Sequence, residues 1–101
     1  MKPAEIEKYG VSNMSSYKGS GNAVANQFLI TINTDKGTKR IFQSYGTIIA
    51  VRDEGGNITL DKNNWEYSPT TSHYRNQFLN ENTAETRQKI NSGVYKLADL
   101  N

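Results

Sequence analysis

The strongest constraint on the fold is a succession of strand-like and turn-like segments between residues 24 and 62. In QFLITIN, apolar side chains occupy every second position (Phe28, Ile30 and Ile32), which is the spacing of one face of a β-strand. The next residues, TDKG, suit a hairpin turn, and TKRIFQS returns as a second strand. This pattern predicts a β-hairpin.

The pattern continues into two further strands. The most apolar segment, YGTIIAVRD, carries Ile48 to Val51 without alternation, as in a strand that is covered on both faces. The turn residues DEGGN follow, and ITLDK returns with Ile58 and Leu60 on one face. Residues 24–62 therefore predict an antiparallel meander of about four strands, which still needs a layer packed on it.

Two helix starts follow the predicted sheet. Ser68 is a suitable N-cap, and Pro69 occupies the first helical position, where its missing N–H costs nothing. Asn82 can cap a second helix, with a glutamate three residues later that completes a variant of the capping box. Gly93 is placed to end this helix in the left-handed conformation. We expect two short helices over residues 68–92.

The flanking segments complete one small domain spanning residues 1–101. Residues 1–22 contain a potential helical turn, AEIEKYG, and a glycine- and serine-rich stretch, and predict a loop-rich segment. Residues 94–101 predict a short strand or tail. The expected fold class is α+β, an antiparallel meander packed against two short C-terminal helices. The expected core consists of Phe28, Ile30, Ile48, Val51, Trp65, Tyr74 and Phe78.

The composition argues against several classes of function. The chain has no cysteine and one histidine, which argues against disulfides, thiolate catalysis and zinc sites. It has no apolar run long enough to cross a bilayer and no signal-peptide core, so we expect a cytoplasmic protein without a membrane partner. Its formal charge of +2 suits neither a mimic of DNA nor a dedicated nucleic-acid binder.

Three features suggest enzymatic chemistry, and each has a plainer explanation. His73 has no second histidine or cysteine to share a metal, and we expect it to be solvated. Asp53 and Glu54 precede GGN and suit a solvated turn. The stretch YKGSGN resembles a phosphate-binding loop, but it lacks the Gly-Lys-Ser/Thr ending and a strand follows it. We therefore expect no catalytic residue, metal site or cofactor.

The candidate contact residues lie in the C-terminal region. Residues 67–97 carry four basic and two acidic side chains, a local charge of +2. The two helices resemble a helix-turn-helix unit, but two short helices packed on a sheet are far commoner than a reader of DNA, and the second helix lacks the Asn/Gln/Arg cluster that base edges require. The aromatic side chains from Trp65 to Phe78 could stack on bases or close the core. The candidates for contact with a partner or with nucleic acid are Tyr67, Arg75, Arg87, Lys89 and Lys96.

Three stretches resemble a family of short bacteriophage-encoded accessory proteins of unknown function: SYGTIIAV, WEYSPTTSHYRNQFL and TAETRQKINSGVYKLADLN. The resemblance covers about residues 38–101 and leaves the N-terminal third unmatched. It implies an accessory role in the cytoplasm of a bacterial host cell rather than a reaction. The matching residues are Ser44, Tyr45, Thr47, Trp65, Tyr67, Ser68, Thr70, Thr71, Tyr74, Phe78 and Leu79.

Three hypotheses follow. The first is a non-enzymatic phage protein that binds a host protein or protein–nucleic-acid complex, as an inhibitor of a bacterial defence system such as CRISPR. The second is a small nucleic-acid-binding module that uses the basic C-terminal helices. The third and weakest, an enzyme acting on nucleotides, rests on YKGSGN and His73. Because only 35% of the residues are apolar, we also expect a partner, or a second copy in a homodimer, to complete the core.

Overall fold

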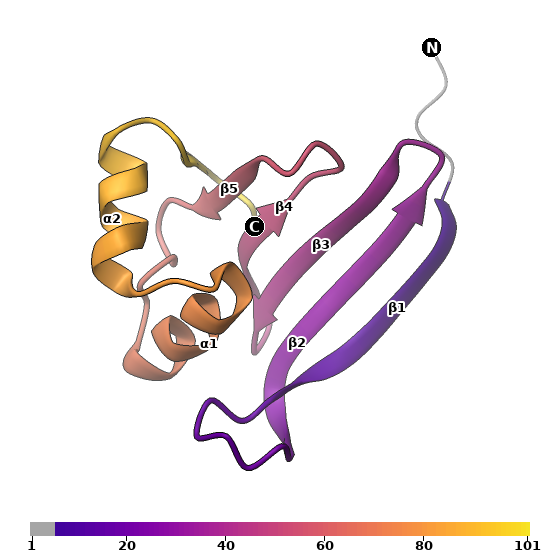
Figure 1. Cartoon of the computed structure of the whole chain (residues 1–101), viewed down its shortest axis with the longest axis horizontal. Helices are drawn as coiled ribbons and strands as arrows, with labels where there is room; N and C mark the ends of the chain where they lie inside the picture. The colour runs from indigo at the N-terminus through magenta and orange to yellow at the C-terminus, as the bar shows by residue number, and fades with distance from the viewer. Residues whose placement is uncertain (1–5) are drawn as a thin grey trace.

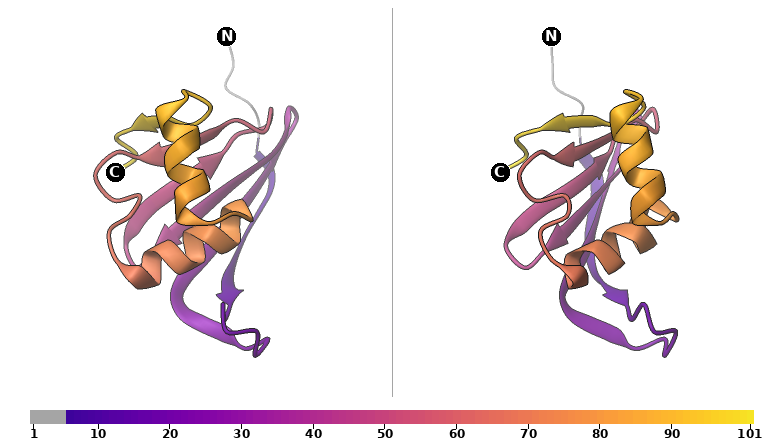
Figure 2. Two further views of the ribbon diagram at one scale, coloured as in Figure 1. Left: turned by 60° about the vertical axis from the view of Figure 1, so that its left-hand side comes forward. Right: turned by 90° about the vertical axis from the view of Figure 1, so that its left-hand side faces the viewer.

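In the computed structural model, which describes residues 6–101 and the side chains from Tyr9 onward, the chain forms a six-stranded sheet with two helices on one face (Figures 1 and 2). The strands follow one another across the sheet in chain order. The elements are β1 (Ile6–Ser15), β2 (Ala23–Thr34), β3 (Gly37–Ser44), β4 (Thr47–Arg52), β5 (Ile58–Asp61), α1 (Pro69–Leu79), α2 (Thr83–Asn91) and β6 (Lys96–Ala98).

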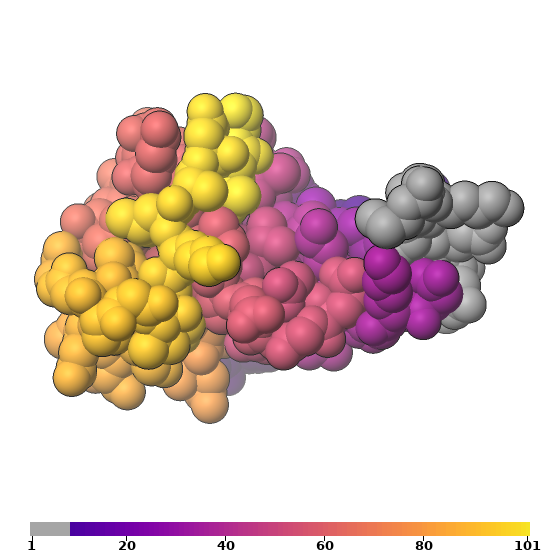
Figure 3. All heavy atoms as spheres, turned by 90° about the horizontal axis from the view of Figure 1, so that it is seen from above, coloured from indigo at the N-terminus to yellow at the C-terminus, as the bar shows by residue number. Residues whose placement is uncertain are grey.

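The expected α+β class is confirmed, and the sheet is larger than expected. The predicted meander corresponds to β2 through β5, which pair antiparallel in order. The described residues add β1, antiparallel to β2, and β6, parallel to β5. β6 runs parallel because α1 and α2 carry the chain back across the sheet before it pairs. The space-filling view places the C-terminal residues at one end of the molecule and the β2–β3 turn toward the other (Figure 3).

The loop-rich prediction for residues 1–22 is corrected by β1. Residues 6–15 form a strand, so the expected helical turn is wrong from Ile6 onward, and residues 1–5 lie outside the described part. Only the glycine- and serine-rich stretch is a loop, closed by a hydrogen bond from Ser16 N to Asn22 O at 2.8 Å. Met14 is buried whereas the residues from Tyr9 to Asn13 are exposed. Burial therefore does not alternate from Tyr9 to Met14, and pairing with β2 decides the conformation of the segment.

The hydrophobic core lies between the sheet and the helices. Trp65 and Tyr74 are buried in it, and Phe78 packs against it with its ring 6.1 Å from that of Phe42. The buried apolar side chains are Met14, Phe42, Ile49, Ala50, Ile58, Leu60, Trp65, Tyr74, Leu79 and Tyr95.

The expected core set requires correction at Phe28, Ile30, Ile48 and Val51, which lie outside this core and remain partly exposed. In β2 to β4 the residues that face the helices are one position away: Leu29 pairs with Phe42, and Phe42 pairs with Ala50. Because side chains alternate along a strand, a shift of one residue moves a side chain to the other face. Both faces of these strands are apolar, so periodicity alone does not reveal which one the helices cover.

The helix ends agree with the prediction. The Ser68 side chain accepts a hydrogen bond from Thr71 N at 3.1 Å, and Pro69 opens α1. Asn82 and Glu85 form a complete capping box at the start of α2. Gly93, with φ of 81°, follows the end of α2 in the left-handed conformation.

Candidate functional site

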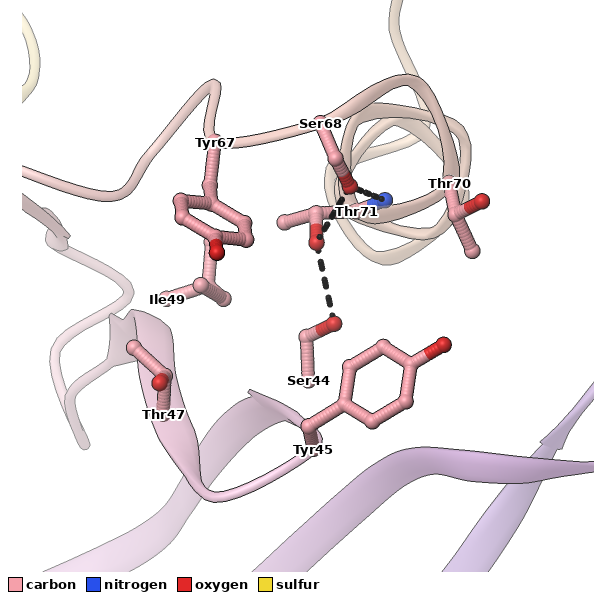
Figure 4. Close-up of a pocket in the computed structure, with 8 residues that line it drawn as sticks. All are labelled: Ser44, Tyr45, Thr47, Ile49, Tyr67, Ser68, Thr70 and Thr71. Carbon is pink, nitrogen blue, oxygen red and sulfur yellow. Dashed lines mark hydrogen bonds between the residues drawn. The ribbon is translucent and has the colours of Figure 1, made fainter.

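A pocket of about 450 Å³ lies between the β3–β4 turn and the start of α1 (Figure 4). Seven of its eight lining residues carry a hydroxyl group, and none carries a charge. We call it the hydroxyl pocket. Its lining residues are Ser44, Tyr45, Thr47, Ile49, Tyr67, Ser68, Thr70 and Thr71.

Hydrogen bonds between hydroxyl groups join the two sides of the pocket. The Ser68 hydroxyl donates to Thr71 Oγ1 at 3.1 Å, and Thr71 Oγ1 lies 3.0 Å from Ser44 Oγ. Because Thr71 Oγ1 accepts from Ser68, its own proton is available for Ser44. Ser44 and Thr71 are both buried, and buried polar groups that are paired in this way hold their elements in register. The helix N-cap is thereby tied to the end of β3.

Two exposed tyrosines flank these hydroxyl groups. Tyr45 is 56% exposed and Tyr67 is 74% exposed. In the view of Figure 4 their rings lie on either side of Ser44 and Thr71. The pocket therefore combines a paired, polar interior with two aromatic rings that solvent can reach.

The backbone of Tyr45 adopts a conformation that is unfavourable for any residue with a Cβ atom. Its φ is 54°, in the left-handed region, although Gly46 beside it does not have a positive φ. The Tyr45 N–H donates to Asn26 O at 2.6 Å, and Asn26 is itself left-handed with φ of 64°. A bulky residue in this region is a true outlier, and such strain concentrates at functional sites. The local strain therefore singles out the Tyr45 side of the pocket.

The five predicted contact residues do not form one surface. Tyr67 lines the hydroxyl pocket, whereas Lys96 is exposed on β6 at the edge of the sheet. Arg75 is fully buried, which corrects its assignment as a contact residue. Its guanidinium donates to Trp65 O at 2.6 Å and to Thr83 Oγ1 at 2.8 Å, and burial lowers its pKa. Arg75 joins α1 to the segments on either side of it.

The two basic side chains of α2 are engaged within the protein. Arg87 forms an ion pair with Glu66 at 2.6 Å and lies over the Trp65 ring at 5.2 Å. Lys89 forms an ion pair with Glu81 at 2.8 Å. A groove-binding role for α2 would require both cations to leave these carboxylates.

Glu81 is the centre of a partly buried polar cluster. Burial alone would raise the pKa of Glu81, but hydrogen bonds from Lys89, Thr86 and Tyr95 hold this pKa below its ordinary value. The Tyr95 hydroxyl donates at 2.6 Å and the Thr86 hydroxyl at 2.5 Å. The cluster connects the start of α2, its last turn and the segment that leads into β6, which is a structural role.

The features behind the enzyme hypothesis are partly brought together. His73 is exposed and stacks on Tyr17, the first residue of YKGSGN, with ring centroids 4.1 Å apart. Asp53 accepts hydrogen bonds from Gly55 N and Asn57 N at 2.9 Å each, as expected of a turn. Hydrogen bonds, of which the one from Asn57 N is the strongest contributor, lower the pKa of Asp53.

Within residues 6–101, no three acidic or histidine side chains are grouped to hold a metal. Within the same residues, no helix is long and apolar enough to cross a membrane.

The contact prediction missed Tyr45 and the hydroxyl groups around it. One signal was available, an aromatic residue in the two-residue link between two apolar strands, where Gly, Asn or Asp is usual. The seven hydroxyl residues of the pocket also belong to the set on which the resemblance rests. They come from two segments, residues 44–47 and 67–71, which the fold brings together.

Comparison with known proteins places this chain in a family. No curated protein and no solved structure matches it significantly. One family model matches residues 7–93, which include β1 except its first residue, β2 to β5, both helices and the hydroxyl pocket. The family thus extends into the N-terminal third, which the resemblance to phage proteins leaves unmatched. The chain belongs to the family of unknown function DUF8033.

Proposed function

We propose that this chain is a non-enzymatic binding protein that contacts a partner macromolecule through the hydroxyl pocket. The observation that carries the proposal is the pair of exposed tyrosines, Tyr45 and Tyr67, held over a hydrogen-bonded interior. Tyrosine is among the residues that dominate binding hot spots, and it loses little side-chain entropy when it is bound. The strained backbone of Tyr45 supports the same site.

The lining restricts the chemistry of the bound group. A pocket of about 450 Å³ has room for a large side chain or a nucleoside. The lining contains no charge, and a buried ion without a counter-charge is costly. The hydroxyl pocket therefore suits an uncharged aromatic or hydrogen-bonding group that stacks on the tyrosines.

The partner class we propose is a host macromolecule of a bacterial defence system such as CRISPR. Its support is the resemblance to short phage-encoded accessory proteins. An inhibitor of this kind occupies a surface of its target, one copy per site, and leaves the target chemically unchanged. Its action is therefore expected to be stoichiometric.

A plaque assay in bacteria with an active CRISPR system tests this proposal. Expression of the protein is expected to restore plaques of a targeted phage, and Tyr67→Ala is expected to lower this protection at least about tenfold, as for a hot-spot residue. Val94→Ala, which truncates an exposed apolar residue outside the pocket lining, is the matched control and should retain protection.

The purified target separates binding from catalysis. Inhibition should be complete at about one copy per target, with the target mass unchanged. Sub-stoichiometric inactivation or an altered target mass contradicts a non-enzymatic role. Absence of protection against every defence system tested removes the defence class. Full protection by Tyr67→Ala removes the pocket as the contact site.

Two arginines on the sheet favour a second candidate function, a small nucleic-acid-binding module. Arg40 and Arg52 are opposite each other in β3 and β4, and among the described residues neither has a carboxylate within ion-pair distance. They line a depression of about 210 Å³ together with Gln77 and Phe78. Like charges in directly opposite positions destabilise a sheet, and a phosphate group between them would relieve this repulsion.

Salt dependence of binding tests the second candidate. Fluorescence anisotropy with a short DNA duplex is expected to show an affinity that falls steeply with salt. Replacing Arg40 and Arg52 by alanine removes two phosphate contacts. The slope of log K against log salt should therefore become shallower by about 2. Lys36→Ala with Lys62→Ala removes the same charge elsewhere on the exposed surface and should not affect affinity or slope comparably. No binding at low salt contradicts the nucleic-acid function.

A further inference from the structure

The sheet face opposite the helices carries eight apolar side chains, which we call the open face. Its middle row runs across four strands, because Val11 pairs with Ile30, Ile30 with Ile41, and Ile41 with Val51. Directly opposite residues of neighbouring strands lie on the same face of a sheet. The open face consists of Tyr9, Val11, Phe28, Ile30, Ile32, Ile41, Ile48 and Val51.

These side chains are accessible to solvent. Tyr9 is 73% exposed and Val11 is 61% exposed, and the other six are partly exposed and lie outside the core. Both helices lie on the other side of the sheet, so neither covers the open face (Figure 2). Contiguous apolar patches on soluble proteins mark interaction surfaces. The chain as a whole is polar, with a mean hydropathy of −0.76. An exposed apolar patch on such a chain therefore indicates a surface that binds a partner.

We propose that the open face is a homodimer interface, in which two copies pack their sheets face to face. The complementary surface for an apolar, uncharged sheet face is another sheet face of the same kind and twist, and the open face of a second copy is such a surface. Its centre is free of charge. Lys39 lies at one end, beside Ile32, and Lys96 lies at the edge strand β6. A two-fold axis therefore brings no like charges together at the centre.

The order of the rows also suits a two-fold arrangement. Tyr9, Ile32 and Lys39 form one outer row, and the opposite outer row contains the amides Asn13 and Gln43. When the strands of the two copies run antiparallel, the Lys39 row of each copy meets the amide row of the other. The Gln43 amide nitrogen donates to Tyr45 O at 2.8 Å, which directs its amide oxygen to other donors such as an ammonium group.

The area of the open face predicts a weak dimer. Four strands about 4.8 Å apart and three rows about 6.7 Å apart give a footprint of roughly 400 Å² per copy. Two footprints bury roughly 800 Å², which is less than the roughly 1,200–2,000 Å² of stable interfaces and falls in the range of weak, transient ones. We expect a reversible dimer with a Kd on the order of 10–100 μM. The hydroxyl pocket lies on the helix side of the sheet, so the dimer is independent of the proposed function.

Sedimentation equilibrium from about 5 to 500 μM tests the dimer directly. The wild-type chain is expected to pass from monomer to dimer over this range, and its Tm should rise with concentration, because association stabilises the folded state. Ile41→Lys introduces a charge at the centre of both copies and is expected to weaken the dimer at least about a hundredfold. Gln88→Lys, which adds the same charge to an exposed position on α2, should leave the dimer unchanged.

A second variant distinguishes loss of the dimer from loss of folding. Val11→Thr with Val51→Thr preserves side-chain shape while making the middle row polar, and it should weaken the dimer at least about tenfold while the circular dichroism spectrum stays unchanged. A wild-type chain that remains monomeric at 500 μM overturns the proposal, and the open face would then belong to a different partner. A dimer that persists in both variants also overturns it, because another surface must then hold the copies together.

Discussion

At the scale of single residues, backbone strain and buried hydroxyl groups define the candidate site. Tyr45 is held in the left-handed region by its hydrogen bond to Asn26, and its side chain is directed to solvent. A left-handed conformation costs a residue with a Cβ about 1–2 kcal/mol, which glycine does not lose. The protein therefore tolerates a locally unfavourable residue at the mouth of the pocket.

This strain leads to a prediction about stability. Tyr45→Gly and Tyr45→Ala both remove the ring, but only glycine relieves the strain, so the glycine variant should be the more stable by about 1 kcal/mol. Tyr67, which has no positive φ, is the matched control, and there alanine should be the more stable by a similar margin. Urea unfolding of the four variants measures both differences. If the alanine variant is more stable than the glycine variant at both positions, the backbone of Tyr45 is not strained.

At the scale of elements, the helices hold the sheet and the pocket together. The N-cap and first turn of α1 supply Ser68 and Thr71 to the hydroxyl pocket, and the later turns of α1 supply Tyr74 and Phe78 to the core. α2 contributes one fully buried side chain, that of Thr86, and is held by polar contacts to Glu81. The position of α2 therefore depends on a carboxylate remaining ionised.

The stability of the protein is accordingly expected to fall in acid. The folded-state pKa of Glu81 is depressed, so its stabilising contribution is complete above the unfolded pKa of about 4.5 and is lost as the pH falls through the lower, folded value. Glu81→Gln should reduce stability by about 1–3 kcal/mol at pH 7 and flatten the loss below pH 5. Urea melts from pH 7 to pH 3 measure this change.

The control is Glu66→Gln, which breaks the exposed ion pair with Arg87 and should cost less than about 1 kcal/mol. Part of the acid sensitivity should remain in Glu81→Gln because of Asp61. Burial would raise the pKa of Asp61, but hydrogen bonds, foremost that from Leu100 N, hold it below its ordinary value. An acid profile of Glu81→Gln identical in shape to that of wild type would contradict the assigned role of Glu81.

At the scale of the whole molecule, the sheet formed by residues 6–98 has two apolar faces, and among the described residues the helices form a layer on one of them. The helices complete a core on one face, while the open face carries branched apolar side chains toward solvent. A chain of 101 residues has only a small core of its own, so burial of the open face in the proposed dimer would add substantially to its stability. The hydroxyl pocket and the open face lie on opposite sides of the sheet, so the two contacts that we propose would be independent of each other.

The sequence by itself determined the features that depend on local chemistry. The hairpin of β2 and β3, the caps at Ser68 and Asn82, and the left-handed Gly93 all follow from side-chain and backbone preferences within a few residues. Such preferences act over one turn of chain, so they can be recognised without knowledge of the rest of the fold. They were sufficient to predict the α+β class and the order of the central elements.

Only the tertiary structure decided which face of the sheet the helices cover and which residues meet at the pocket. Ile30 and Phe42 are equally apolar, and a register difference of one residue places one on the open face and the other in the core. Arg75, a candidate contact residue by sequence, is buried because α1 packs its charged side chain against neighbouring carbonyl and hydroxyl groups. The hydroxyl pocket joins residues 44–49 to residues 67–71, and only the packing of α1 on the sheet brings these segments together.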